Sequence, residues 1–522
     1  MKKQELFNNA TEGFTYQRAP QQTGLYDAAY EHDACGVGML VDIHGKKSHD
    51  LVESALKVLE NMRHRGAEGA DNKTGDGAGI MLQIPHEFIL LQGIPVPEKG
   101  RYGTGLLFLP KNEEDQAAIL SIIIEEIEKE GLTLMHLRNV PTCPEILGEA
   151  ALANEPDIKQ VFITGFTETE AADRKLYLIR KRIENKVRLS AIPTRNDFYV
   201  VSLSTKSIIY KGMLSSLQLR NYYPDLTNSY FTSGLALVHS RFSTNTFPTW
   251  GLAQPFRLLA HNGEINTIRG NADKMLAREE NMESEHLHGE LHKILPVINA
   301  SGSDSAMLDN TLEFLVMSGM DLPLAVMIMI PEPWANNAVM TQKKKDFYQY
   351  YATMMEPWDG PASILFSDGD MMGAVLDRNG LRPSRYYITD DDYLILSSEV
   401  GVLDIDPTHI VTKDRLRPGK MLLVDTVQGR VIDDDELKER YADKRPYCEW
   451  LDSNIVMLKD LKIPNERVPE YTQEERQRMQ RAFGYTYESL KDSILPMAKN
   501  GIEGTAAMGT DTPLAALSGN RE

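Results

Sequence analysis

Tyr30-Glu31-His32-Asp33-Ala34-Cys35-Gly36-Val37-Gly38 is the stretch on which the prediction of fold and function depends. Cys35 stands here between a polar leader and a short run in which Val37, Met39 and Val41 alternate with other residues, and this alternation predicts a mostly buried strand. A lone cysteine is most often a small buried apolar residue. Partners elsewhere in the chain decide whether Cys35 is instead a nucleophile.

The composition of the 522 residues is that of a globular protein with more than one domain. Hydrophobic residues make up 42% and charged residues 25% of the chain. The formal net charge of −19 argues against a nucleic-acid-binding face, which would need basic residues. No apolar run approaches the roughly 20 residues of a membrane span, and residues 1–34 lack the apolar part of a secretory signal. We therefore expect neither nucleic acid nor a membrane as a partner.

The three cysteines, Cys35, Cys143 and Cys448, are too few and too scattered for a disulfide framework or a Cys-x-x-Cys metal site. This usage is typical of a cytoplasmic protein, and it predicts no iron–sulfur or structural zinc site. We expect no metal and no cofactor in this chain. Four histidines adjoin the motifs described below without cysteine or carboxylate partners at metal-binding spacing, and we interpret them as structural residues or as residues that support the site residues without touching substrate: His32, His64, His239 and His261.

Apolar periodicity alternates between the helix and strand patterns along the chain. It predicts a helix from His49 that ends near Arg65-Gly66, a glycine-rich turn at 74–79 before a strand at 80–84, alternating strands and helices over 104–234, strands at 235–239 and 256–260, and helices at 266–283, 433–439 and 473–482. Residues 362–398 are predicted to form a meander of short strands, with a hairpin turn at Asn379-Gly380. Ser303 is expected to open a further helix, with Asp304 in its first turn, where a carboxylate suits the helix dipole.

Four polar groups stand out because each adjoins a glycine or a turn and not a helical apolar stripe: Arg65 in His-Arg-Gly, Arg241 in His-Ser-Arg-Phe-Ser-Thr, Asn262-Gly263 in His-Asn-Gly-Glu, and Asp304 in Ser-Asp-Ser. Each has an ordinary structural explanation when taken singly. Arg65 could form a surface salt bridge, Asn262-Gly263 a plain turn and Asp304 a helix cap.

Taken together with Cys-Gly-Val-Gly at 35–38, these motifs resemble, in this order, the class II glutamine amidotransferases, which use an N-terminal cysteine nucleophile. Longer phrases resemble the amino-terminal region of the glutamate synthase large subunit family: Glu-His-Asp-Ala-Cys-Gly (31–36), Thr-Gly-Asp-Gly-Ala-Gly (74–79), Phe-Pro-Thr-Trp (247–250) and Asp-Arg-Asn-Gly-Leu-Arg-Pro (377–383). The resemblance covers the chain from about residue 24 onward.

The resemblance implies an α+β fold, the four-layer αββα sandwich of the N-terminal-nucleophile hydrolases with mostly antiparallel sheets, followed by the start of a second α/β domain. It divides the chain into a propeptide at 1–34 that is removed to expose Cys35, a class II glutamine amidotransferase domain at 35–430, and a linker with the truncated start of the glutamate synthase central domain at 431–522. FMN and an iron–sulfur cluster are expected in the missing part of the full-length enzyme.

The chemistry of a cysteine nucleophile explains why a leader would be removed. A thiol is mostly protonated at neutral pH and needs a base. Cleavage before Cys35 would expose its own α-amino group, whose reference pKa of about 7.7–8.0 suits that role. By resemblance, the Asn262 side chain and the Gly263 N–H are the oxyanion donors, and Arg65 orders the site around Cys35.

By the same resemblance, Arg241 binds the α-carboxylate of glutamine and Asp304 its α-ammonium group. Trp250 is a packing residue or, alternatively, a wall of the glutamine pocket. The implied function is hydrolysis of glutamine to glutamate and ammonia through a Cys35 glutamyl thioester, as the ammonia-supplying part of a glutamate synthase whose site for 2-oxoglutarate is absent from this chain.

The expected partners are L-glutamine, the remaining synthase domains and a small electron-donating subunit. Two alternatives stay open: a class II glutaminase that serves another ammonia acceptor, and an unprocessed, inactive fragment.

Overall fold

The computed structural model describes residues 35–69, 71, 73–168, 171–241, 248–287, 289–462 and 469–504. The chain divides into two compact units, one that ends at Ser453 and one that begins at Asn454. The predicted propeptide at 1–34 lies outside the described residues, as do motif residues 242–247. The boundary predicted near residue 430 falls within the first unit.

The strands of the first unit are β1 (Gly36–Asp42), β2 (Ala78–Gln83), β3 (Gly103–Leu109), β4 (Thr133–Asn139), β5 (Asp157–Thr164), β6 (Tyr199–Val200), β7 (Ser207–Gly212), β8 (Leu235–Ser240), β9 (Leu259–Gly263), β10 (Ala362–Ser367), β11 (Met371–Leu376), β12 (Arg385–Thr389), β13 (Tyr393–Ser397), β14 (Ile410–Arg415), β15 (Met421–Asp425) and β16 (Arg430–Ile432). In the described part of the chain they form a seven-stranded sheet in the order β14-β12-β13-β1-β8-β2-β7, a five-stranded sheet in the order β16-β15-β11-β10-β9, and a four-stranded sheet in the order β4-β5-β3-β6. Every strand pairing within these described ranges is antiparallel.

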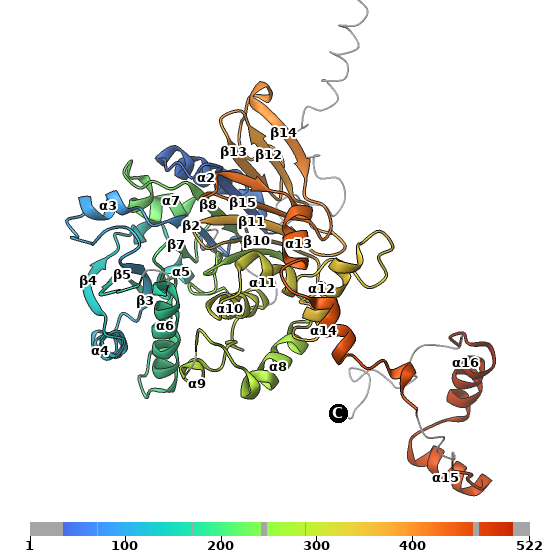
Figure 1. Ribbon diagram of the computed structural model, residues 1–522. Coiled ribbons are helices and arrows are strands. Elements are labelled where there is room, and N and C mark those ends of the chain that lie inside the picture. Colours follow the sequence, from blue (N-terminus) through green and yellow to red (C-terminus); the bar gives the residue numbers. More distant parts are fainter. Residues whose placement is uncertain are drawn as a thin grey trace, which may run out of the picture. The chain divides into compact units, whose positions relative to one another are not determined.

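The α-helices of the first unit are α2 (His49–Asn61), α3 (His86–Leu91), α4 (Glu113–Lys129), α5 (Glu149–Ala153), α6 (Ala172–Leu189), α7 (Gln218–Tyr222), α8 (Ile268–Arg278), α9 (Leu291–Ile294), α10 (Asp304–Met317), α11 (Leu322–Met329), α12 (Gln342–Ala352), α13 (Asp434–Ala442) and α14 (Tyr447–Asn454). Helix α2 packs on the seven-stranded sheet and α10 on the five-stranded sheet, while β1 and β8 of the first sheet contact β9 and β10 of the second (Figure 1). The predicted α+β sandwich, with helices outside two antiparallel sheets, is confirmed. Helices α4 and α6 cover the third, four-stranded sheet.

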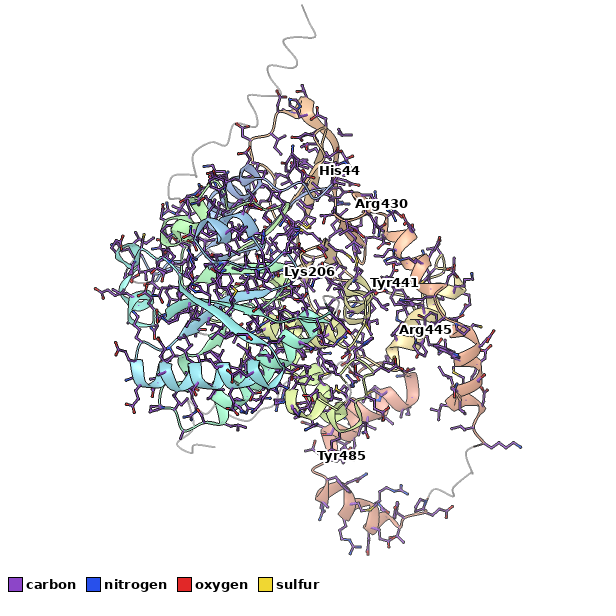
Figure 2. All side chains as sticks on the ribbon, turned by 60° about the vertical axis from the view of Figure 1, so that its left-hand side comes forward. His44, Lys206, Arg430, Tyr441, Arg445 and Tyr485 are labelled. Carbon is purple, nitrogen blue, oxygen red and sulfur yellow. The ribbon has the colours of Figure 1, made fainter. Side chains whose placement is uncertain are left out.

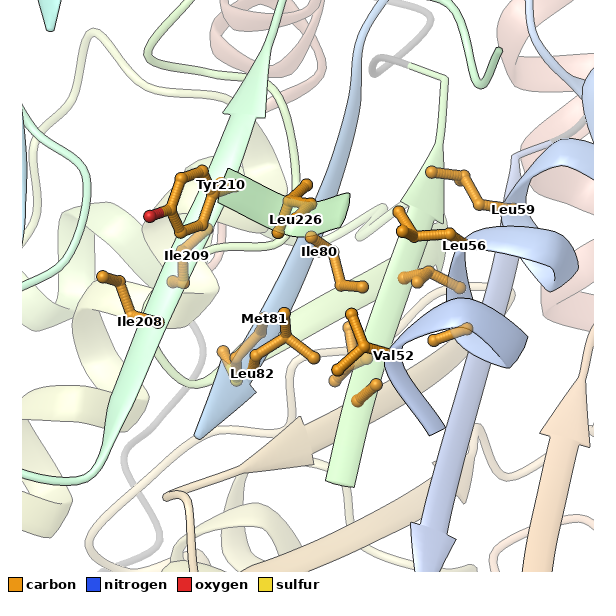
Figure 3. Packing of buried hydrophobic residues seen from close by; sticks show 14 of the residues in the cluster. Val52, Leu56, Leu59, Ile80, Met81, Leu82, Ile208, Ile209, Tyr210 and Leu226 are labelled. Atoms are coloured by element: carbon orange, nitrogen blue, oxygen red, sulfur yellow. The ribbon is translucent and has the colours of Figure 1, made fainter. Parts of the chain in front are cut away.

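The core between α2 and the seven-stranded sheet shows why this sequence packs in layers. Figure 3 shows Leu56 of α2 and Ile80 of β2 in one buried cluster with Tyr210 of β7. A Cβ atom on Gly38 would lie 2.8 Å from Cγ1 of Val58, so glycine in β1 allows the helix to approach the strand closely. Burial of each large apolar side chain contributes about 1.5–3 kcal/mol relative to its exposure.

The structure confirms the predicted meander and corrects its connectivity. The strands expected within 362–398 are β10 to β13. The Gly380 N–H donates to the carbonyl of Asp377 at 3.0 Å, and Gly380 has a φ of +62°, so a turn forms at Asn379-Gly380. The prediction of a hairpin is nevertheless wrong, because β11 pairs with β10 and β15 while β12 pairs with β13 and β14 in the other sheet. The turn carries the chain from one sheet to the other.

Ion pairs at the surface join neighbouring segments of the first unit. Lys206 Nζ lies 2.7 Å from Asp370 Oδ2, and Arg430 Nη2 lies 2.6 Å from Glu436 Oε1. Figure 2 labels Lys206 and Arg430 among the side chains of this unit. Exposed pairs of this kind contribute little to stability, because water and salt screen them.

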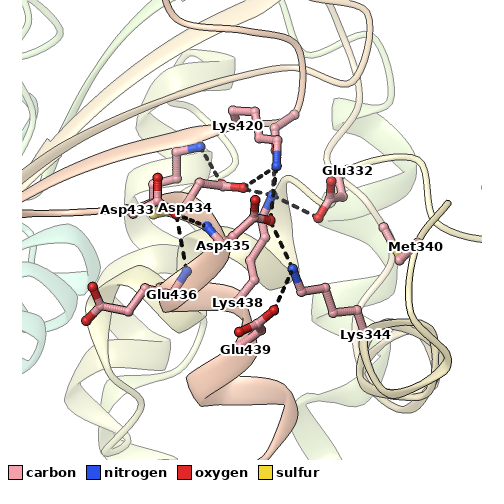
Figure 4. Close-up of polar contacts among 12 residues, drawn as sticks. Glu332, Met340, Lys344, Lys420, Asp433, Asp434, Asp435, Glu436, Lys438 and Glu439 are labelled. Atoms are coloured by element: carbon pink, nitrogen blue, oxygen red, sulfur yellow. Dashed lines mark hydrogen bonds and ion pairs between the residues drawn. The ribbon is translucent and has the colours of Figure 1, made fainter.

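Lys438 of α13 forms a different kind of ion-pair cluster, one that is buried (Figure 4). Its Nζ lies 2.8 Å from Glu332 Oε1 and 2.9 Å from Asp434 Oδ1, and it donates to the carbonyl of Gly419 at 2.9 Å. The Lys438 side chain is only 3% exposed. The cluster therefore ties α13 to the loop before β15 and to the segment that follows α11.

Replacing Lys438 by methionine should lower the free energy of unfolding by about 3–5 kcal/mol, since Glu332 would lose its ion-pair partner and Asp434 would keep only Lys420, whose Nζ lies 2.7 Å from its Oδ2. Urea denaturation followed by circular dichroism measures this loss. Lys343→Met is the matched control, because Lys343 is paired with Asp443 at 2.7 Å but is 74% exposed. An equal effect of the two substitutions would contradict a structural role for the buried cluster.

The second unit is described by itself. It contains α15 (Gln473–Ala482), a π-helical turn at Ser489–Ile494 and α16 (Leu495–Asn500). Thr472 and Glu475 form a capping box that begins α15, which confirms the helix predicted at 473–482. Tyr485, labelled in Figure 2, is 50% exposed. No helix in either unit's described residues is both long and apolar enough to cross a membrane.

Candidate active site

Antiparallel pairing brings Cys35 next to Arg241. Gly36 at the start of β1 pairs with Ser240 at the end of β8, so the residues just outside the two strands, Cys35 and Arg241, adjoin each other. Ala78 at the start of β2 pairs with the same Ser240, which adds the loop at 75–77 to this edge of the sheet. Two of the predicted site residues are thus neighbours although 206 positions separate them in the sequence.

Asn262 reaches Cys35 from the second sheet. Its side-chain Nδ2 donates to the carbonyl oxygen of Cys35 at 3.0 Å. The next residue, Gly263, ends β9 with a φ of +148°, and a Cβ atom there would lie 1.9 Å from the carbonyl oxygen of Pro361. Only glycine fits this position at the end of β9, directly after Asn262.

Asp304 lies at the N-terminus of α10, where Ser303 caps the helix as predicted by accepting from the Ala306 N–H at 3.2 Å. Its Oδ2 accepts from the N–H of Ile265 at 3.0 Å, and its Oδ1 accepts from the N–H of Ser305 at 2.7 Å. These bonds fix the carboxylate against the loop that follows Asn262 and Gly263.

Arg241 is held by its backbone and its side chain. Its φ of +89° is in the left-handed region, and its N–H donates to the carbonyl of Gly77 at 2.8 Å. Its Nε lies 3.6 Å from Oδ2 of Asp76. A residue other than glycine at positive φ is uncommon, and the hydrogen bond to Gly77 helps to retain it here.

The charged groups of the site act on the thiol of Cys35. Burial raises the pKa of Cys35 to about 11, Arg241 and Arg382 oppose the rise, and Asp304 and Asp76 add to it. Burial outweighs the two cations, so the thiol form prevails at neutral pH. The sulfur therefore needs a base to become a nucleophile.

Arg65 adjoins the start of β1. A Cβ atom on Gly36 would lie 3.3 Å from Cβ of Arg65, and the guanidinium pairs with Glu399, which follows β13. His64 Nε2 also lies 2.8 Å from Glu399 Oε2. The pKa of His64 is lowered by partial burial and by Arg65. Arg65 thus lies between the start of β1 and the residue that follows β13, and its supporting role at the site stays a prediction.

Trp250 packs in the core. Its Nε1 donates to the carbonyl of Ala151 at 3.1 Å, and its ring meets Phe108 edge-on with centroids 6.0 Å apart. A Cβ atom on Gly212 would lie 2.4 Å from Cζ3 of the indole. The sequence left two roles open for Trp250, a packing residue or a wall of the glutamine pocket, and these contacts favour the packing role.

Several residues near Cys35 were not singled out from the sequence. Asp76 and Arg382 lie inside the quoted phrases at 74–79 and 377–383, and a charged residue beside glycine or proline was the available signal. Glu399 lies in no motif, and only its pairing with Arg65 identifies it. In the residues that the structure describes, no group of three or more His, Cys, Asp or Glu side chains could hold a metal ion.

The fold and this site define a class of protein, and comparison with known proteins agrees. The model of the class-II glutamine amidotransferases matches residues 35–450, and the chain belongs to this family. A second model, of the glutamate synthase central domain, matches residues 478–522.

The curated relatives narrow the comparison to glutamate synthases. The chain is 46% identical over 509 residues to the glutamate synthase [NADPH] large chain of Bacillus subtilis, a match that covers 97% of this chain and 33% of that protein. It is 43% identical over 498 residues to ferredoxin-dependent glutamate synthase 2 of Synechocystis, covering 94% of this chain and 31% of that one. The chain thus spans about a third of the length of these relatives.

Among solved structures, glutamine phosphoribosylpyrophosphate amidotransferase from B. subtilis aligns with a TM-score of 0.32 and 14% identity, over 76% of this chain and 49% of that one.

Proposed function

We propose that this chain hydrolyses L-glutamine to L-glutamate and ammonia, with Cys35 as the nucleophile, as the ammonia-supplying part of a glutamate synthase. The observation that carries the proposal is the approach of Asn262 Nδ2 to within 3.0 Å of the Cys35 carbonyl, with Arg241 and Asp304 close enough to act on the pKa of the thiol. A nucleophile, an amide donor and two opposite charges then meet at one edge of the sandwich.

The reaction begins when the α-amino group of Cys35 takes the thiol proton and the sulfur attacks the side-chain amide carbon of glutamine. The carbonyl becomes an oxyanion that accepts from the Asn262 amide and the Gly263 N–H. The amide nitrogen takes up the proton and leaves as ammonia, and a glutamyl thioester remains. Water then adds to the thioester, and the carbon–sulfur bond breaks to release glutamate and restore the thiol.

Arg241 and Asp304 recognise the amino-acid end of the substrate in this proposal. A guanidinium binds a carboxylate by paired hydrogen bonds, and Asp304 offers its charge to the α-ammonium group. The two opposite charges select an α-amino acid over other primary amides, which explains why glutamine would be the substrate.

The peptide bond between Ala34 and Cys35 is cleaved in this proposal, because the base must be an amine and not an amide nitrogen. The start of the family match at residue 35 supports this division of the chain. The remaining synthase domains and a small electron-donating subunit are proposed as partners in a longer assembly. FMN, an iron–sulfur cluster and the 2-oxoglutarate site are assigned to those parts, and no step described for this chain runs through them.

The test is ammonia and glutamate release from L-glutamine by the processed chain, with and without 2-oxoglutarate and the missing synthase parts. Equal amounts of glutamate and ammonia from the chain alone are expected. Release of neither product would support an inactive fragment, and transfer of ammonia to an acceptor other than 2-oxoglutarate would contradict the glutamate synthase assignment.

Asn262→Ala should lower kcat about 100- to 1,000-fold, because one of the two proposed oxyanion donors is lost. Steady-state kinetics with L-glutamine measure this change. Asn221→Ala is the control, since Asn221 is an exposed residue of α7 whose Nδ2 donates only to the nearby Leu217 carbonyl at 3.0 Å. Unchanged kcat in Asn262→Ala would exclude this residue as an oxyanion donor.

A further inference from the structure

A buried hydrogen-bond cluster connects the two ends of the proposed glutamine site. Gln254 turns its side chain toward β9, where Oε1 accepts from the His261 N–H at 2.8 Å. Its Nε2 lies 3.3 Å from the His261 carbonyl oxygen and 3.5 Å from Ser305 Oγ. Each of these three residues is at most 2% exposed. We name Gln254, His261 and Ser305 the Gln254 clamp.

The clamp reaches the carboxylate of Asp304 through Ser305. His261 Nδ1 lies 2.8 Å from Ser305 Oγ, and that hydroxyl lies 3.1 Å from Asp304 Oδ1. A hydroxyl has one proton to donate, and the carboxylate can only accept it. His261 therefore carries its proton on Nδ1 and donates it to Ser305, which in turn donates to Asp304.

A second histidine completes the cluster from the first sheet. His239 Nε2 lies 3.1 Å from the His261 carbonyl oxygen and must donate to it, since a carbonyl only accepts. Burial lowers the pKa of both imidazoles, that of His239 to about 3. Both histidines are therefore neutral at physiological pH, and their hydrogen-bond directions are fixed.

Strand β2 packs closely against the segment that carries Gln254. A Cβ atom on Gly79 would lie 2.5 Å from the backbone carbonyl oxygen of Gln254, so this glycine lets the segment of Gln254 rest directly on the first sheet. The clamp thus connects three elements of the sandwich: the first sheet through Gly79 and His239, the second through His261, and the start of α10 through Ser305.

The clamp residues are sequence neighbours of the residues proposed to bind substrate. His261 immediately precedes Asn262, the proposed amide-end donor, and Ser305 immediately follows Asp304, the proposed α-ammonium receptor. The Ile265 N–H adds a further link to Asp304 Oδ2 at 3.0 Å. The separation between the groups that bind the two ends of the substrate is therefore set by buried hydrogen bonds and not by a flexible loop.

We propose that the Gln254 clamp determines which amino-acid side chain the site accepts, by fixing the separation between Asn262 and Asp304 to suit glutamine and not its shorter homologue asparagine. This inference rests on the proposed function. One missing methylene group typically changes kcat/KM about 10- to 200-fold, and a misplacement of about 1 Å can cost about 100-fold in rate. A selection of this size requires that the groups which bind the two ends of the substrate are held rigidly. Gln254 and Ser305 are the positioning residues that hold them.

The test compares hydrolysis of L-glutamine and L-asparagine by the processed chain and two variants. Ser305→Ala removes the hydroxyl between His261 and Asp304, and Gln254→Glu keeps the size of the side chain but loses its N–H donors. Both should raise KM for glutamine more than they lower kcat, and the ratio of kcat/KM for glutamine to that for asparagine should fall by about tenfold or more.

Ser202→Ala is the matched control, because Ser202 is also buried, at 2% exposed, but lies beside β3 of the third sheet. It should keep the wild-type ratio, and circular dichroism should show all variants folded. A wild-type ratio in either clamp variant, or an equal loss toward both amino acids, would overturn the inference. Failure of the wild-type chain to hydrolyse glutamine would instead contradict the proposed function, so the two failures are distinguishable.

Discussion

Replacing Cys35 by alanine is expected to abolish glutamine hydrolysis while leaving the fold intact. The side chain at position 35 provides the bond that holds the glutamyl group, and alanine offers no atom to form it. What remains would be binding by Arg241 and Asp304 and polarisation of the amide by Asn262, and neither creates a nucleophile. The loss should exceed that in Asn262→Ala, which retains the sulfur.

The measurement is ammonia release together with calorimetric binding of L-glutamine to Cys35→Ala. Binding should persist, because the charged groups that recognise the amino acid are unchanged. Cys143→Ala and Cys448→Ala are matched controls, since both thiols lie in other parts of the chain, one half-buried and one exposed. Full glutaminase activity in Cys35→Ala would remove Cys35 from the role of nucleophile, and loss of activity in either control would show that the effect is not specific to position 35.

Much of this site was predictable from the sequence because its residues occupy local motifs. Ser303 caps α10 and Asp304 lies in its first turn, as the Ser-Asp-Ser pattern indicated. Gly263 has a positive φ, which glycine adopts readily, although Asn262 and Gly263 end strand β9 and do not form a plain turn. Local chemistry determines these features, and a single stretch of sequence displays it.

The rest depends on pairings between distant segments. No local pattern shows that Gly36 pairs with Ser240, or that β11 and β12 enter different sheets on either side of the Asn379-Gly380 turn. Glu399 meets Arg65 only because β13 lies beside β1. Hydrophobic periodicity identifies strands but not their neighbours. The structure was therefore needed to identify the partner of Arg65, and it was also needed to identify the Gln254 clamp.

The environment of Cys35 bears directly on the predicted leader. Burial raises the pKa of its thiol to about 11 in spite of Arg241 and Arg382. A raised thiol pKa favours the protonated form at every pH below it, so at pH 7 nearly all of the sulfur is present as the thiol. The cations of the site do not activate the sulfur, and a base within reach of it must do so.

Removal of residues 1–34 is therefore expected to switch the activity on. In the processed chain the α-amino group of Cys35, with a reference pKa of about 7.7–8.0, accepts the thiol proton, so kcat/KM should rise with pH and level off above about pH 8. In the chain that retains the leader, the same nitrogen is an amide and cannot accept a proton. Its residual activity should be far lower at pH 7 and should still be rising with pH beyond 9, toward the pKa of the buried thiol.

Mass spectrometry of each sample, paired with its pH–rate profile, tests this mechanism. Acetylation of the α-amino group of the processed chain is the control, because it masks the base without restoring the leader, and it should return the profile to that of the unprocessed chain. If acetylation left the activity unchanged, a different group would have to take the proton. If a chain shown by its mass to retain residues 1–34 were fully active at pH 7, the masked amine could not be the switch, and the raised pKa of Cys35 would demand another base among its neighbours.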